Sequence, residues 1–121
     1  MSGRHRLAAA LVTVVIGAAA SPLAQAQDTA TASADRTEAG RKVYISSCQR
    51  CHGINLVSNG IGFDLRTFPA HDKARFVRSV NEGLRAMPAW SATLKPAQLE
   101  LLWTYIGAVN GWPAEPVPAP Q

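Results

Sequence analysis

The chain has 121 residues, of which 47% are hydrophobic and 17% charged, and 12 basic against 8 acidic side chains give a formal net charge of +4. This length suits one small domain and excludes a large enzyme. The modest positive charge also argues against a protein that binds nucleic acid.

The first 26 residues have the pattern of a secretory signal peptide. Arg4 and Arg6 precede an apolar run over residues 7–20, and small residues follow at Ala24 and Ala26. We therefore expect cleavage near Ala26 and export to the periplasm. Retention of the segment as an anchor is the alternative, but its run of 14 residues falls short of the ~20 that span a bilayer.

Cleavage after Ala26 would leave 95 residues with 10 basic and 8 acidic side chains, a formal charge of +2. No later apolar stretch approaches spanning length, so we expect a soluble product without membrane insertion. A chain this small buries only about two-thirds of its unfolded surface. Its composition therefore favours an additional stabilising cofactor or cross-link.

The domain is predicted to begin at residue 35. Residues 27–34 are small and polar and predict a flexible leader, whereas a helix is expected from Asp35 toward Cys48, with Asp35 or Thr37 as its cap. Gly40 and Tyr44 are spaced i and i+4 on this helix. Because glycine in a helix costs ~1 kcal/mol against alanine, Gly40 predicts the close passage of another element.

Two further helices are expected beyond a loop over residues 53–70. The first runs from His71 or Asp72 to Glu82 and is stopped by Gly83. A second loop precedes a helix from Pro96 to Asn110, whose apolar residues are spaced i, i+3, i+4 and i+7: Leu99, Leu102, Trp103 and Ile106. The domain is expected to end at residue 111, and residues 112–121 predict an extended, proline-rich tail.

The chemistry of the chain is concentrated in the stretch "CQRCH", which contains both cysteines and is followed by Gly53. A disulfide, a thioredoxin-type redox pair or a zinc site could use Cys48 and Cys51. The first two leave His52 unexplained, and zinc would need the distant His71 as a further ligand. CxxCH is the attachment motif of a c-type haem, in which two thioethers hold the haem and the histidine ligates iron. We therefore predict one covalent haem c, with Cys48 and Cys51 binding the cofactor and His52 binding its iron.

Met87 is the candidate for the second axial position. It is the only methionine that remains after processing, and it lies 35 residues beyond His52 in "RAMPAW", where Pro88 stiffens the backbone. Thioether ligation is typical of electron-transfer haems. Packing in the core is the alternative role of a methionine. His71 is expected to be a helix-cap or surface residue.

These motifs resemble the small class I monohaem cytochromes c over residues 35–111. Gly40 and Tyr44 resemble that family's N-terminal helix, and "LWTYI", with Leu102 and Tyr105, resembles the C-terminal helix that crosses it. The resemblance implies an all-α fold with about three main helices and wrapping loops around one haem. One departure concerns "GFDL", in which Phe63 replaces a proline that the family usually has near the carbonyl acceptor for the proximal histidine. The sequence does not identify the carbonyl that accepts the hydrogen bond from His52, although a backbone carbonyl near Gly62 could serve.

The resemblance implies a monomeric one-electron carrier and not an enzyme, so no catalytic residue is assigned. "FDLRTFP", "RFVRSVNEG" and "MPAW" are similar to periplasmic cytochromes that accept electrons from quinoprotein alcohol dehydrogenases, which use pyrroloquinoline quinone. The implied partners are a redox protein donor of that kind and an acceptor that is a terminal oxidase or another cytochrome. An open-coordination haem protein, peroxidase-like or gas-sensing, and a thiol-redox or interaction module without haem remain the alternatives.

Overall fold

A computed structural model describes residues 22–113 of the chain. The described helices are α1 (Pro22–Ser47), α2 (Gln49–His52), α3 (Lys73–Glu82) and α4 (Pro96–Asn110), with short 3-10 turns η1 (Ile54–Leu56) and η2 (Leu65–Thr67). Among these residues the only β contact is an isolated bridge between Leu84 and Met87. The predicted all-α fold is confirmed. Most of the predicted signal peptide (1–21) and of the proline-rich tail (114–121) lies outside the described residues.

The second and third predicted helices occur where their capping residues place them. The Asp72 carboxylate accepts a hydrogen bond from the Arg75 backbone N–H at the start of α3, and Gly83 follows its last residue. Pro96 opens α4, and Gly111 ends it in the left-handed conformation. These boundaries confirm the two predictions because the caps satisfy backbone groups that a helix end otherwise leaves without partners.

The first helix is longer than predicted. Residues 27–34, expected as a flexible leader, are helical in α1, and Asp35 and Thr37 lie inside the helix instead of capping it. The Thr31 hydroxyl donates back to the Gln27 carbonyl at 3.0 Å, and alanines alternate with the threonines. Alanine favours helix, and adding turns to an existing helix costs less than starting one. Residues 22–32 are all exposed, so this extension adds no residue to the core.

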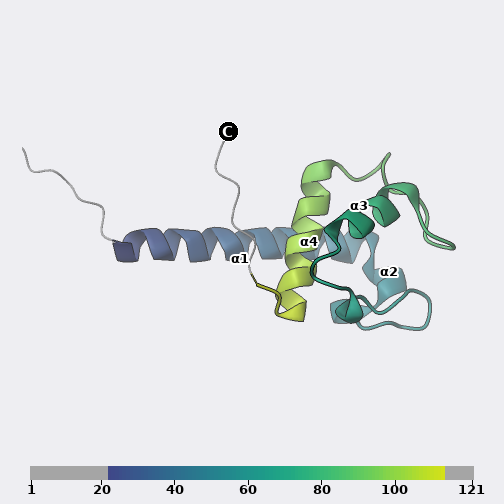
Figure 1. The fold of residues 1–121 in the computed structure, drawn as a ribbon, viewed down its shortest axis with the longest axis horizontal. Helices are drawn as coiled ribbons and strands as arrows, with labels where there is room; N and C mark the ends of the chain where they lie inside the picture. The colour runs from purple at the N-terminus through teal and green to yellow at the C-terminus, as the bar shows by residue number, and fades with distance from the viewer. Residues whose placement is uncertain (1–21, 114–121) are drawn as a thin grey trace, which may run out of the picture.

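Gly40 marks the place where α4 crosses α1 (Figure 1). A Cβ atom there would lie 2.0 Å from the Leu101 carbonyl oxygen and 2.9 Å from the Tyr105 Cβ. The rings of Tyr44 and Tyr105 then meet with centroids 5.3 Å apart. The predicted close passage at Gly40 is confirmed, and its immediate neighbours are Leu101 and Tyr105.

The core lies along the inner face of α4. Trp103 is the centre of an aromatic cluster, with ring centroids 6.0 Å from Phe68, 5.3 Å from Phe76 and 4.6 Å from Trp112. The loops that follow α2 and α3 gather beyond the crossing, while the N-terminal part of α1 projects away from it (Figure 1). Within residues 22–113, no helix is long and apolar enough to cross a membrane.

Candidate functional site

The end of α1 and the single turn of α2 present both cysteines and the histidine. The Cys48 N–H donates to the Tyr44 carbonyl at 2.8 Å, and the His52 N–H donates to the Cys48 carbonyl at 2.9 Å. Cys48 is half-buried, Cys51 is exposed, and both are free thiols. A helical turn therefore presents the three side chains of the motif together at the junction of α1 and the following loop.

The thiol of Cys48 is not activated for redox chemistry. Burial, and then the neighbouring Cys51, raise the pKa of Cys48 from 9.0 to about 11. Thioredoxin-type pairs need a thiolate, and their nucleophilic cysteine has a lowered pKa. The environment of Cys48 thus disfavours the redox-pair alternative.

The imidazole of His52 is oriented by the loop that wraps beneath it. Its Nδ1 lies 2.8 Å from the Phe63 carbonyl oxygen. A carbonyl can only accept, so Nδ1 carries the proton and Nε2 keeps its lone pair for a metal. Immediately beyond His52, the buried Tyr44 hydroxyl donates to the Gly53 carbonyl at 2.6 Å. The contact with Phe63 thus favours a tautomer whose Nε2 could ligate a metal.

The acceptor left unassigned from the sequence is therefore the Phe63 carbonyl, next to Gly62. A Cβ on Gly62 would lie 2.9 Å from His52 Nδ1 and 2.6 Å from the Cys51 carbonyl oxygen. Only glycine allows the backbone to approach the imidazole so closely. The replacement of the usual proline by Phe63 leaves the hydrogen bond to the histidine in place.

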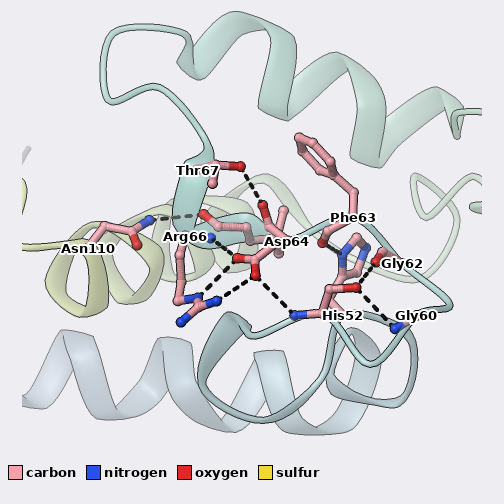
Figure 2. Close-up of polar contacts among 10 residues, drawn as sticks. His52, Gly60, Gly62, Phe63, Asp64, Arg66, Thr67 and Asn110 are labelled. Carbon is pink, nitrogen blue, oxygen red and sulfur yellow. Dashed lines mark hydrogen bonds and ion pairs between the residues drawn. The ribbon is translucent and has the colours of Figure 1, made fainter.

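Asp64 and Arg66 hold the other side of this loop (Figure 2). Arg66 donates from Nη2 to Asp64 Oδ2 at 2.7 Å, and from its backbone N–H to Asp64 Oδ1 at 3.0 Å. Hydrogen bonding by the Arg66 side chain is the main reason that the pKa of Asp64 falls from 3.8 to about 2. Asp64 is therefore ionised at neutral pH.

Met87 lies in the tight turn that follows α3. Leu84 and Met87 exchange both backbone hydrogen bonds, at 3.1 and 3.0 Å, across this turn. The Met87 side chain is half-buried and packs against the core, so its position is compatible with both the ligand and the packing alternatives. His71 is exposed, and Asp72 is the capping residue of α3.

The donor set fits a c-type haem. The free thiol of Cys48 precedes the turn that ends at His52, that of Cys51 lies within this turn, and the imidazole is oriented through Nδ1. Within residues 22–113, no three His, Cys, Asp or Glu side chains gather into a group that could hold a metal ion. Cys48 and Cys51 would carry the haem as thioethers, and His52 would supply one axial ligand.

Sequence reasoning missed three side chains that shape this site, namely Ser58, Asp64 and the Tyr44 hydroxyl. The first two are exposed or half-buried polar residues of a loop, which usually have no special role. Serine and aspartate near glycine do favour local bonds to backbone groups. That composition was the available signal, but it does not indicate which backbone atoms are bound.

Comparisons with known proteins agree with this chemistry. The sequence profile of the family described as cytochrome c oxidase, cbb3-type, subunit III matches residues 35–106. Similar proteins include the quinohemoprotein alcohol dehydrogenase ADH IIB of Pseudomonas putida, which is 30% identical over 79 residues. The CcoP subunit of the cbb3-type cytochrome c oxidase of Azospirillum brasilense is 31% identical over 84 residues. Cytochrome c6 of Gloeothece citriformis is 34% identical over 80 residues.

These matches differ in how much of each relative they cover. They involve 63%, 61% and 60% of this chain, but 11% of the dehydrogenase, 28% of CcoP and 73% of cytochrome c6. The chain thus spans about a tenth of the dehydrogenase. No solved structure is significantly similar to the chain.

The family profile covers more than half of the chain, and most of a small cytochrome aligns with the segment that contains the haem motif. This chain therefore belongs to the cytochrome c family, as a small class I cytochrome c with covalently bound haem c.

Proposed function

We propose that the chain is a periplasmic one-electron carrier whose haem iron is ligated by His52 and Met87. The observation that carries the proposal is the 2.8 Å hydrogen bond from His52 Nδ1 to the Phe63 carbonyl, which leaves the Nε2 lone pair for a metal. The bound haem supplies a one-electron iron couple. Cys48 and Cys51 would hold that group covalently next to His52.

Met87 completes the proposed coordination. It is the only methionine beyond residue 26, and two backbone hydrogen bonds between Leu84 and Met87 close the turn that contains it. With both axial positions filled by protein, iron could exchange electrons without binding a substrate. We therefore propose that the protein is not an enzyme.

The absorption spectrum of the purified protein tests this function. We expect a reduced low-spin haem spectrum that carbon monoxide leaves unchanged, because both axial positions are occupied. A high-spin spectrum and ready binding of carbon monoxide would instead identify an open-coordination haem protein, peroxidase-like or gas-sensing. The absence of any haem absorption in protein from an export-competent host would contradict both.

The proposed partners are redox proteins. We propose a quinoprotein, PQQ-dependent alcohol dehydrogenase as the donor and a terminal oxidase or another cytochrome as the acceptor. Support for the donor comes from the similarity to a segment of quinohemoprotein alcohol dehydrogenase ADH IIB, and support for the acceptor from the similarity to CcoP. The proposed compartment follows from residues 1–26, with cleavage near Ala26. The processed protein is proposed to be a monomer.

The proposed docking surface surrounds the Met87 turn. Arg85 is exposed in this turn and has a positive φ of 55°, while Trp90 is half-buried beside it and donates its backbone N–H to the Val80 carbonyl. Electron-transfer complexes are commonly small, below ~1,200 Å² of buried surface, because turnover requires release. A processed charge of +2 favours weak electrostatic steering.

Strong electrostatic steering accelerates association by ~10 to 1,000-fold, and salt screens it. Because steering of this protein is expected to be weak, the rate of electron transfer should change by less than about tenfold when salt is raised across the physiological range. Stopped-flow kinetics with the reduced donor measures this rate. Arg85→Glu should slow the reaction more than Lys42→Glu, which makes the same charge change at an exposed position of α1. A loss of several orders of magnitude with salt, or equal effects of the two variants, would contradict the proposed docking.

A further inference from the structure

The carbonyl that accepts the His52 hydrogen bond belongs to Phe63, whose own side chain does little to restrain its backbone. The Phe63 side chain is 58% exposed, so packing of its ring contributes little to holding its backbone. A proline at this position would restrict φ through its ring, but phenylalanine leaves φ free. The 2.8 Å contact with His52 Nδ1 therefore requires restraint from the residues on either side of Phe63.

On the N-terminal side, Gly62 is held at both of its backbone polar groups. Its N–H donates to the Cys51 carbonyl at 2.7 Å, and its own carbonyl accepts from the Ser58 hydroxyl at 2.5 Å. The Ser58 hydroxyl oxygen in turn accepts from the Gly60 N–H at 3.1 Å. Ser58 thereby closes the turn that leads into Phe63.

On the C-terminal side, the Asp64 carboxylate binds several groups (Figure 2). Arg66 donates to it from its backbone N–H at 3.0 Å, from Nε at 3.1 Å and from Nη2 at 2.7 Å. The Ser58 N–H donates to Oδ2 at 3.4 Å, and the Thr67 hydroxyl donates to the Asp64 carbonyl at 2.9 Å. Ser58 thus contacts both neighbours of Phe63, and the peptide group between Phe63 and Asp64 lies inside a closed network.

We infer that Ser58 and Asp64 are positioning residues that set the hydrogen bond from His52 to the Phe63 carbonyl and, through it, the reduction potential of the haem. This inference rests on the proposed role of His52 as an iron ligand. A firm acceptor at Nδ1 makes the imidazole a stronger donor to iron and favours the oxidised state. A loosened loop weakens that hydrogen bond and raises the reduction potential.

Asp64 also caps η2 by accepting the Arg66 backbone N–H, but the ion pair between the two side chains adds little to the stability of the fold. The side chains of Arg66 and Asp64 are 50% and 26% exposed, and exposed ion pairs contribute little to stability. A matched pair exists elsewhere, since Asp72 accepts the Arg75 backbone N–H and lies 2.8 Å from Arg75 Nε. That pair caps α3 and has no contact with residues 62–64 among its hydrogen bonds.

The experiment compares Ser58→Ala and Asp64→Ala with Asp72→Ala in the haem-loaded protein. Two quantities are measured: the reduction potential, and the rate at which the His52 Nδ1 proton exchanges with solvent in the reduced protein, followed by NMR. We expect both loop variants to raise the potential, up to the equivalent of a tenfold shift in the redox equilibrium, about 59 mV for one electron. We also expect at least tenfold faster exchange in both, whereas Asp72→Ala changes neither quantity.

Wild-type exchange and potential in both loop variants, or equal shifts in Asp72→Ala, would overturn the inference. If Asp64→Ala fails to take up haem, Ser58→Ala decides the question because it removes a single hydroxyl. The proposed function is tested separately in the oxidised wild-type protein. Without a paramagnetic shift of the His52 ring protons, His52 is no ligand and that function fails whatever the variants show.

Discussion

Replacing both Cys48 and Cys51 with serine abolishes covalent haem and leaves most of the chain unfolded; this is the largest effect we expect. Serine hydroxyls cannot form the two thioether bonds. Between residues 45 and 67 only Gly53 and Leu56 are buried, so this third of the domain has little apolar core of its own. A small chain that depends on a cofactor for its core is expected to fold with the cofactor.

Mass spectrometry of the denatured protein measures the attached haem, and circular dichroism measures the remaining helix. The expected change is from one haem per chain to none. Ser46→Ala and Ser47→Ala are control substitutions in the last turn of α1, directly before Cys48, and both should retain the full complement of haem. Undiminished covalent haem in the double cysteine variant would show that attachment occurs elsewhere.

Substituting Met87 with alanine is expected to open the iron. As a ligand, Met87 supplies the thioether-to-iron charge-transfer band near the red end of the oxidised spectrum, so this band should disappear. The reduction potential should fall, because thioether ligation raises it, and carbon monoxide should now bind. Absorption spectroscopy and potentiometry measure these changes.

The packing role of Met87 makes a different forecast. Truncation of a buried methionine costs ~2 to 5 kcal/mol of stability, and less for the half-buried Met87, but it would leave the iron spectrum intact. Leu84→Ala is the matched control, since Leu84 is the partner of Met87 across the turn and is 59% exposed. Met87→His should restore a closed low-spin haem at a lower potential. An unchanged charge-transfer band in Met87→Ala would remove Met87 from the coordination sphere.

The structure confirms most strongly the elements that carry local signals. Helix α4 runs from Pro96 to Asn110, as its apolar spacing, first-turn proline and terminal glycine predict. Helix α3 likewise agrees with its pattern of Phe76 and Val80 and with its cap at Asp72. Such signals act within one or two turns, so they can be evaluated without knowledge of the tertiary structure.

The first helix shows where local signals misled. Its polar, small N-terminal residues predicted a flexible leader, but α1 continues through them to Pro22. Composition alone does not determine whether such a segment is helical or disordered. Alanine propensity and the packed turns that follow it favour helix, whereas the absence of an apolar face favours disorder.

At the site, the sequence by itself determined the chemistry. The spacing of Cys48, Cys51 and His52 specifies thioether attachment and an adjacent imidazole, because all three lie within five consecutive residues. Gly40 also predicted a close helix crossing, since a glycine inside a helix is costly without such a reason.

Only the tertiary structure decided how the imidazole is held. The Phe63 carbonyl is eleven residues from His52, and every residue of the loop offers a similar carbonyl. The choice among them depends on how Ser58, Gly62 and Asp64 close the loop on one another, at distances of 2.5 to 3.4 Å. Every residue has the same backbone carbonyl, so the sequence does not indicate which carbonyl a side chain will bind. The acceptor can be identified only from the folded loop.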